Sequence, residues 1–271
     1  MTAQRRLARG LVLATSGLVL VLACADLAAA QTCAAPRALV DTAVGIKYCA
    51  DPAFAAVIDA SVAKIRQEIS AQRQAGRLVI YASTPISPRG GGVEKVNIDI
   101  AASVKARLEK SYGGHAWVLN PGVYQLPKVG GHDAGGGEYM VLWTRVLGGD
   151  DGAGRDIDMT HFTGPGDMRA FFSCGGNDLT GCLTHWLDTR SGTDADIRRV
   201  ADNADARRAF LRYYTLRASV AYSAGSHDEW NIVVRINRKR RLGDQIAVFF
   251  DGRSASPAEM ETEVSPGYET R

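Results

Sequence analysis

The stretch Leu78-Val79-Ile80-Tyr81-Ala82-Ser83 decides how this chain folds. Its first four residues, 78–81, are apolar and mostly branched or aromatic, which favours a strand buried on both faces. An amphipathic helix precedes it. Asp51-Pro52 supplies the helix start, Gly76 supplies the end, and the apolar residues between them recur every three or four positions. The sequence therefore predicts a helix that runs into a buried strand.

The alternation of helix and strand continues along the chain. Gly90-Gly91-Gly92 is a loop, after which residues 93–108 form a second amphipathic helix. Further strands are predicted at 117–119, 157–162, 218–222 and 246–250, and further helices at 138–147, 168–172, 179–187, 198–214 and 226–237. This order builds a largely parallel sheet. We expect an α/β fold of about five strands with helices on both faces, a Rossmann-like or flavodoxin-like three-layer sandwich. It forms a single domain over residues 31–271 and ends in a short polar tail.

The first thirty residues have the three parts of an export signal. Three arginines come within the first nine residues, residues 11–23 are apolar, and Ala28-Ala29-Ala30 offers a small-residue cleavage site. The apolar run is too short to cross a bilayer, because a membrane-spanning helix needs about 20 residues. We therefore expect a signal peptide over residues 1–30 and a periplasmic or secreted protein of a Gram-negative bacterium.

An alternative leader signal ends at Cys24. Val21-Leu22-Ala23-Cys24 resembles the signal of bacterial lipoproteins, in which cleavage leaves a lipidated cysteine. Leu22 is bulky for its position in that signal, and the three alanines downstream make the better cleavage site. Lipidation of Cys24 is therefore the less favoured alternative.

The remaining cysteines predict disulfides. Cys33, Cys49, Cys174 and Cys182 are an even number in a chain expected to reach an oxidising compartment. Of the three possible connectivities, Cys33–Cys49 with Cys174–Cys182 closes the shortest loops, and the first bridge would close the N-terminal segment. No Cys-x-x-Cys occurs, and the histidines are isolated in the sequence, so we expect no metal site and no cofactor.

Composition limits the possible partners. The chain has 271 residues and a formal net charge of +3. Without the three arginines and one aspartate of the leader, 29 basic and 28 acidic residues remain. This balance does not favour binding to nucleic acid or to an anionic membrane surface. No later stretch is long and apolar enough for a transmembrane segment. We expect a small-molecule ligand, bound at the edge of the sheet. The oligomeric state stays open.

A binding site is expected at the carboxyl ends of the parallel strands, where loops enter helix amino termini. The polar residues that follow the predicted strands are Ser83, Thr84, Ser87, Arg89, Asn120, Asp167, Ser226, His227, Asp228, Glu229, Asp251 and Arg253. Arg89, on a glycine-rich loop, is the best candidate for contact with an anion or a carboxylate. The three glycines could cradle a phosphate, but they lack the lysine of a P-loop and also suit a flexible connection.

Residues 226–229 have two interpretations. Ser226 and Glu229 match a capping box, which explains both residues as a helix start. His227 and Asp228 are not needed for that box, although an acid in a first helical turn also complements the helix dipole. The basic run 238–241 is interpreted as a solvated helix end, which the same dipole favours.

Three short motifs lie within residues 77–167: Leu78-Val79-Ile80-Tyr81-Ala82-Ser83-Thr84-Pro85, Val118-Leu119-Asn120-Pro121 and Glu138-Tyr139-Met140. With them, this part of the chain resembles the start of nucleoside 2-deoxyribosyltransferase-like proteins. The resemblance implies a flavodoxin-like sheet and a glutamate nucleophile that cleaves an N-glycosidic bond. It also implies that Tyr81, Ser83 and Pro85 contact a nucleoside and that Asp167 lies near the sugar. The family's glutamate is missing from residues 167–174, and Glu229 is the best-placed substitute.

Two functions follow as hypotheses. The first is a hydrolase or transferase acting on a nucleoside-like or glycosidic molecule. Glu229 or Asp228 would be its nucleophile or base, His227 a further catalytic candidate, and Arg89 and Asn120 would orient the ligand. The second is a non-catalytic binding or envelope-interaction protein on the same scaffold. Serine-hydrolase chemistry is less favoured, because no Gly-x-Ser-x-Gly motif occurs.

Overall fold

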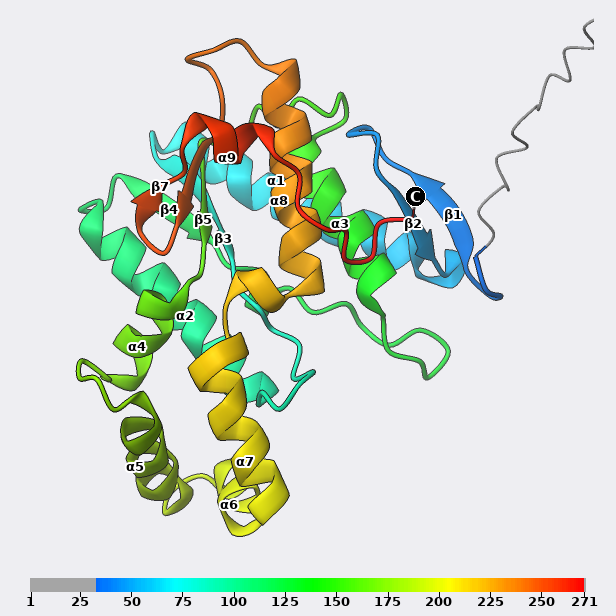
Figure 1. Ribbon diagram of the computed structural model, residues 1–271. Helices are drawn as coiled ribbons and strands as arrows, with labels where there is room; N and C mark the ends of the chain where they lie inside the picture. Colours follow the sequence, from blue (N-terminus) through cyan, green and yellow to red (C-terminus); the bar gives the residue numbers. More distant parts are fainter. Residues whose placement is uncertain (1–32, 271) are drawn as a thin grey trace, which may run out of the picture. The chain divides into compact units, whose positions relative to one another are not determined.

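A five-stranded, mostly parallel sheet forms the centre of this protein, whose computed structural model describes residues 33–270 (Figure 1). The strand order is β4-β3-β5-β6-β7. The strands are β3 (Leu78–Ser83), β4 (Ala116–Leu119), β5 (Met159–Phe162), β6 (Ala247–Phe250) and β7 (Arg253–Ser254). The first four of this order are parallel, and only β7 is antiparallel to its neighbour. The expected signal peptide and the alternative lipidation of Cys24 lie outside the described residues.

Helices connect the strands and cover the sheet. The α-helices are α1 (Ala55–Gln74), α2 (Glu94–Ser111), α3 (Gly136–Gly148), α4 (Pro165–Phe172), α5 (Leu179–Ser191), α6 (Ala195–Asp202), α7 (Ala204–Arg212), α8 (Ala224–Lys239) and α9 (Pro257–Glu261). Shorter turns of helix are η1 (Pro52–Phe54), η2 (Pro121–Val123), η3 (Tyr213–Arg217) and η4 (Val220–Tyr222). Among the described residues, no helix has the length and apolar character that crossing a membrane requires.

Strand β3 shows how both faces of the sheet are buried. Val79 and Tyr81 belong to one apolar core, with side chains from α1, α3 and α8. Ile80 and Ala82 belong to a second core, with side chains from α2, α4, α5 and α7. Alternate residues of a strand point to opposite faces of the sheet. A strand that is covered on both faces therefore needs consecutive apolar residues, as at 78–80. The predicted α/β fold with a mostly parallel sheet flanked by helices is confirmed.

Two predicted elements are wrong. Residues 218–222 are not a strand, because Ser219 caps the short turn η4. Val220 N–H donates to Thr163 O at 3.1 Å, one residue beyond the end of β5. The helix predicted over 198–214 is two helices. Asn203 breaks it, since its side chain accepts hydrogen bonds from the N–H groups of Asp205 and Ala206 and so begins α7. Both errors arise because a local cap outweighed the periodic pattern.

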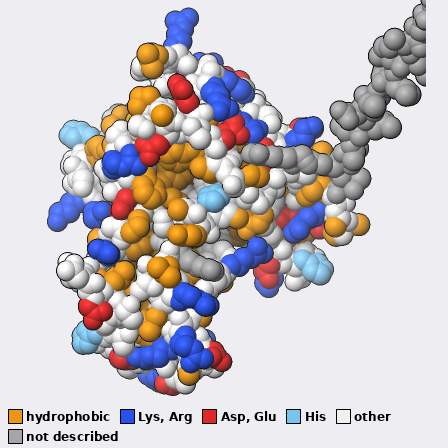
Figure 2. Space-filling view, viewed as in Figure 1, with side chains coloured by type: hydrophobic (Ala, Val, Ile, Leu, Met, Phe, Trp, Pro, Cys, Tyr) orange, Lys and Arg blue, Asp and Glu red, His pale blue; other side chains and the backbone are white. Residues whose placement is uncertain are grey.

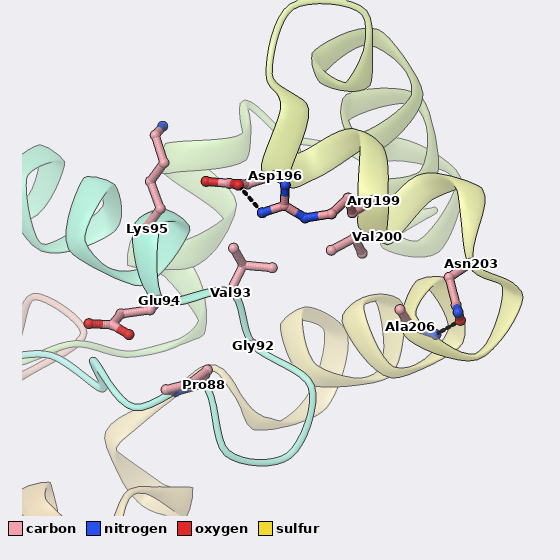
Figure 3. Close-up of a pocket in the computed structure, with 10 residues that line it drawn as sticks. All are labelled: Pro88, Gly92, Val93, Glu94, Lys95, Asp196, Arg199, Val200, Asn203 and Ala206. Atoms are coloured by element: carbon pink, nitrogen blue, oxygen red, sulfur yellow. Dashed lines mark hydrogen bonds and ion pairs between the residues drawn. The ribbon is translucent and has the colours of Figure 1, made fainter. Parts of the chain in front are cut away.

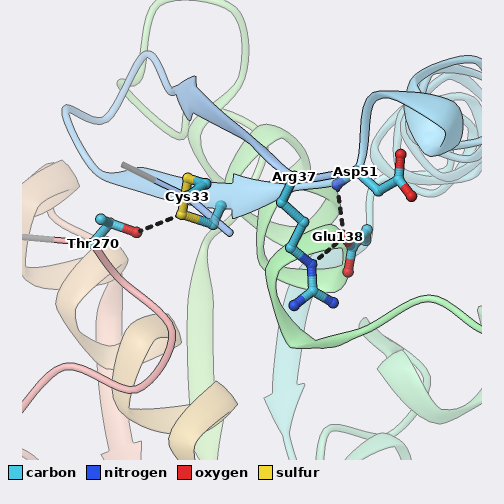
Figure 4. Close-up of a disulfide and its surroundings, with 6 residues drawn as sticks. Cys33, Arg37, Asp51, Glu138 and Thr270 are labelled. Atoms are coloured by element: carbon cyan, nitrogen blue, oxygen red, sulfur yellow. Dashed lines mark hydrogen bonds and ion pairs between the residues drawn. A yellow bond between two sulfur atoms is a disulfide. The ribbon is translucent and has the colours of Figure 1, made fainter. Parts of the chain in front are cut away.

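An N-terminal hairpin that the sequence did not predict packs against α3. It consists of β1 (Ala38–Asp41) and β2 (Lys47–Ala50), which pair antiparallel. The disulfide Cys33–Cys49 closes it, and Thr270 Oγ1 lies 3.7 Å from Cys49 Sγ (Figure 4). Glu138 ties the hairpin to α3 by accepting hydrogen bonds from Asp51 N–H at 2.8 Å and Arg37 Nε at 3.2 Å. The two ends of the described chain are therefore joined at one place.

The second disulfide, Cys174–Cys182, links the end of α4 to α5. Both bridges have the pairing that the shortest-loop argument predicted. This bridge belongs to the apolar core on the α2 side of the sheet, where Cys174 is buried.

We expect the double variant Cys174→Ala/Cys182→Ala to unfold with a free energy about 2–4 kcal/mol lower than the parent, because an open loop gains entropy in the unfolded chain. Urea denaturation of both proteins under oxidising conditions measures the difference. Under reducing conditions that open both bridges, the difference should shrink to the effect of the alanines alone. Equal midpoints under oxidising conditions would contradict this role of the bridge.

Candidate functional site

Glu229 of α8 lies against the end of β3, where its carboxyl group is held by two hydroxyls. Tyr81 OH donates to Glu229 Oε1 at 2.6 Å, and Ser83 Oγ donates to Oε2 at 2.5 Å. All three side chains are buried. Tyr81 and Ser83 are two positions apart on one strand and therefore point to the same face of the sheet. Of the predicted site residues, the structure brings these three together.

The start of α8 explains why Glu229 is free to make these contacts. The predicted cap at Ser226 is wrong: Ser223 Oγ caps the helix by accepting from Ser226 N–H at 3.3 Å, and α8 begins at Ala224. Glu229 therefore lies beyond the first turn, on the buried face of the helix. Its carboxyl group does not return to a cap residue and points to β3 instead.

Burial raises the pKa of Glu229 to about 7, and the nearby charge of Asp228 adds to this effect, while the hydrogen bonds from Ser83 and Tyr81 oppose it. The pKa of Tyr81 is also raised, first by burial and then by Glu229, so the phenol stays protonated and donates. A carboxyl group that titrates near neutral pH can serve as acid, base or nucleophile. Glu229 is therefore the best-poised reactive group of the predicted set.

Tyr48 of β2 belongs to the same buried polar region, and sequence reasoning missed it. Its pKa is raised by burial first and then by the negative charges of Asp228, Glu269 and Glu229. Glu269 pairs with Arg235 at 2.7 Å. Nothing in the sequence marks Tyr48 or Glu269, because each comes from a segment far from α8 and neither belongs to a motif.

Asp228 and His227 bind the C-terminal strap, residues 262–270. Asp228 accepts hydrogen bonds from Gly267 N–H and Tyr268 N–H, both at 2.7 Å. The two ring nitrogens of His227 lie within 3.0 Å of the carbonyl oxygens of Ser265 and Ala221. The predicted polar tail is thus packed on α8, and these two predicted catalytic side chains already have structural partners.

A glycine is required where the strap crosses the start of α8. A Cβ on Gly267 would lie 1.8 Å from Ala224 O, so only glycine allows this approach. Further along, Asn231 holds the strap at Val264 through hydrogen bonds of 2.8 and 3.1 Å. The strap is therefore fixed along α8 by backbone contacts as well as by the Asp228 carboxylate.

The other predicted ligand contacts do not converge on Glu229. Arg89 is exposed, with Nη1 3.5 Å from Tyr268 OH in the strap. Asn120 caps η2 by accepting from Gly122 N–H at 2.8 Å. Asp167 caps α4 at Gly164 N–H and lies 2.9 Å from His161 Nε2. The structure therefore gives Asn120 and Asp167 roles in helix starts.

The environment of Asp167 also differs from that of Glu229. Burial alone would raise the pKa of Asp167, but the hydrogen bonds from His161 and Arg107 hold it below its ordinary value. This carboxylate stays ionised at neutral pH and stabilises the junction of β5, α4 and α2. Such a fully paired carboxylate suits a structural role better than a catalytic one.

A cavity of about 470 Å³ opens between the start of α2 and the helices α6 and α7 (Figure 3). Its lining includes Val93, Lys95, Asp196, Arg199 and Asn203. It lies on the α2 side of the sheet, whereas Glu229 contacts residues of β3 that face the α8 side. The cavity and the buried carboxyl group are therefore separate features.

The predicted glycine loop has a packing role beside this cavity. A Cβ on Gly91 would lie 2.5 Å from Ala209 O, and one on Gly92 would lie 2.8 Å from the Tyr213 ring. These glycines let the loop after β3 approach α7 and η3 closely. This packing explains the run without phosphate binding.

On the visible face, basic and acidic side chains are mixed around apolar ones (Figure 2). Within residues 33–270, no three His, Cys, Asp or Glu side chains gather as metal ligands would. No family model, curated protein or solved structure matches this chain.

We expect the stability of Glu229→Gln to rise relative to the parent as the pH increases. The pKa of Glu229 is about 7 in the folded protein, whereas its ordinary value is 4.5. The folded parent therefore loses stability as the pH rises from 4.5 to 7, because ionisation of Glu229 is less favourable in the folded than in the unfolded chain. The full difference, reached above pH 7, is about 3 kcal/mol. Urea denaturation between pH 4 and 8 measures it. Asp167→Asn is the opposite control, because its lowered pKa means that the parent loses stability as the pH falls. A pH-independent difference for Glu229→Gln would contradict the raised pKa.

We expect Asp228→Ala to release the C-terminal strap. Without the carboxylate, the amides of Gly267 and Tyr268 lose their acceptor, at a cost of about 1–3 kcal/mol. Hydrogen exchange of a peptide covering residues 262–270 should become faster. The exposed Asp205→Ala variant should leave this exchange unchanged. Unaltered protection in Asp228→Ala would show that other contacts hold the strap.

Proposed function

We propose that this chain is an exported hydrolase or transferase that acts on a nucleoside-like or glycosidic small molecule, with Glu229 as its reacting carboxyl group. The observation that carries the proposal is the buried Glu229 carboxyl group, with a pKa of about 7, held by Tyr81 and Ser83. Isolated buried carboxyl groups are costly, and such perturbed groups concentrate at functional sites.

The sheet order supports the finer fold within this proposal. With β3 as the first strand of the sheet, the order β4-β3-β5-β6 is that of a flavodoxin-like sheet, 2-1-3-4. In such sheets ligands bind where the strand order reverses, between the first and third strands. Ser83 ends β3 and pairs with Phe162 of β5 at this point. The hydroxyl that holds Glu229 therefore belongs to the edge where a ligand is expected.

In the proposed reaction, the ionised Glu229 carboxylate attacks the anomeric carbon of the sugar. The bond to the base or aglycone breaks, and the leaving group takes a proton from solvent. Water or a second acceptor then cleaves the glycosyl ester and regenerates the carboxylate. Tyr81 and Ser83 orient the carboxyl group by donating to its two oxygens. Asp228 is the weaker candidate, because both of its oxygens bind the strap.

Export belongs to the same proposal. The sequence predicts a signal peptide over residues 1–30, and the structure contains two disulfides, which persist in oxidising compartments. Both observations support a periplasmic or secreted location. The resemblance to nucleoside 2-deoxyribosyltransferase-like proteins supports the substrate class, because its strand residues Tyr81 and Ser83 are the ones in contact with Glu229.

A non-catalytic binding protein is the second candidate function. It is favoured by the separation of the 470 Å³ cavity from Glu229 and by the hydrogen bonds that already occupy both carboxyl oxygens. For this candidate, a nucleoside or sugar raises the melting temperature but no product forms.

We expect Glu229→Gln to lower turnover about 100-fold or more, because an amide can neither attack nor exchange a proton. The assay is release of free base from a panel of nucleosides and of nitrophenol from aryl glycosides by the mature protein. Glu138→Gln is the matched control, since Glu138 is also a buried carboxylate but binds the hairpin. It should keep its activity per folded molecule. Retained activity in Glu229→Gln would refute the assignment, and stabilisation without product would support the binding protein.

A further inference from the structure

A basic pocket lies at the amino edge of the sheet, opposite the edge that carries Glu229. It has a volume of about 360 Å³ and is lined by Ala153, Arg155, Lys239, Arg240, Arg241 and Asp244. These residues come from the loop between α3 and β5 and from the turn that leads from α8 into β6. The sequence pattern alone predicts a solvated helix end at residues 238–241.

Arg240 lines this pocket and differs from a solvated cation. Its side chain is only 12% exposed. Its Nε is buried and has no hydrogen-bond partner within residues 33–270. A buried donor on a charged group that lacks an acceptor is unfavourable, and a nearby anion would offset part of this cost through its charge.

The bonds that Arg240 does make are long. Its guanidinium lies 3.2 Å from Asp244 Oδ1, 3.3 Å from Gly154 O and 3.5 Å from Ile157 O. Hydrogen bonds between an ionised nitrogen and a carboxylate are ordinarily about 2.7–2.9 Å. The protein therefore holds this guanidinium in place without fully satisfying it.

The surrounding charges favour an anion. Asp244 is the acidic residue of the lining, against the cations Arg155, Lys239, Arg240 and Arg241. Arg155 also pairs with Asp151 at 3.1 Å, and Lys239 donates to Ala43 O at 2.9 Å. No residue that the structure describes pairs with the Arg241 side chain. The cations thus exceed the acids, and one of them has its donors available.

We propose that this pocket binds a phosphate group. A tetrahedral anion with several acceptor oxygens can accept from the forked guanidinium of Arg241 and lie among the other cations of the lining at once, and arginine recognises phosphate best through such paired donors. The volume lies within the range of small-molecule sites and leaves room for a group esterified to the phosphate. The cations come from two segments, the α8 end and the 149–156 loop, so they can surround the anion.

The proposal is tested by titrating the mature, full-length protein with inorganic phosphate at constant ionic strength, with chloride as the balancing anion. We expect saturable binding by calorimetry and a concentration-dependent rise in melting temperature. The double variant Arg155→Gln/Arg241→Gln should bind phosphate at least tenfold more weakly. Arg238→Gln is the matched control from the same basic run, because Arg238 pairs with Glu263 and does not line the pocket. It should retain the parent affinity.

Two sources of phosphate are distinguished by a second arm. A nucleoside monophosphate and vesicles of phosphatidylglycerol are each added to the same variants, with phosphatidylcholine vesicles as the neutral comparison. Pocket-dependent binding of the soluble ester alone identifies a soluble ligand. Pocket-dependent binding of the anionic vesicles, competed by inorganic phosphate, identifies a lipid headgroup.

Three outcomes would overturn the proposal. The first is phosphate binding no stronger than that of chloride at equal ionic strength. The second is equal phosphate affinity in the double variant and in Arg238→Gln. The third is vesicle binding that inorganic phosphate does not compete, which would indicate diffuse surface attraction. None of these readouts depends on Glu229, so the proposed reaction and the phosphate pocket can fail independently.

Discussion

The buried Glu229 carboxyl group is the constraint on which the carboxyl edge of the sheet depends. A carboxyl group enclosed among apolar side chains is tolerated only where hydrogen bonds replace water. Tyr81 and Ser83 supply these bonds because they are two positions apart on β3 and therefore lie on the same face of the sheet. The position of α8 follows, since a shift of this helix by one residue would remove the carboxyl group from both hydroxyls. The group that is costly to bury is therefore also the one that fixes the helix.

The C-terminal strap holds α8 from the opposite side. Asp228 and Asn231 bind its backbone, and Arg235 pairs with Glu263 at 3.0 Å and with Glu269 at 2.7 Å. Thr270 N–H then donates to Lys47 O in the N-terminal hairpin at 2.8 Å. The strap thus connects α8 to the hairpin that the Cys33–Cys49 bridge closes. Several buried residues of α8 are polar because they bind β3 or the strap. The sequence of α8 is therefore less hydrophobic than that of most helices packed in a core.

Helix α8 also joins two edges of different charge. Its first half carries Asp228 and Glu229 near the carboxyl edge of the sheet, and its end carries Arg238, Lys239 and Arg240 at the amino edge. The cations in the last turn agree with the helix dipole, whereas Asp228 and Glu229 lie beyond the first turn, where the dipole has little effect. The dipole therefore accounts neither for the enclosed carboxyl group at one edge nor for the buried, unsatisfied Arg240 Nε at the other.

The sequence by itself determined the long helices, the strands at 78–81 and 117–119, and both disulfide pairings, because periodicity and loop length are local properties. It misplaced the start of α8, since Ser223 and Ser226 are both competent caps and only packing selects between them. It could not reveal that Glu229 meets Tyr81, because 148 residues separate the two partners. Nor could it show that Asp167 is paired with His161 or that Asp228 holds the strap. Tertiary structure decided these roles, because the partner of a carboxyl group depends on which segments the sheet and its helices bring together.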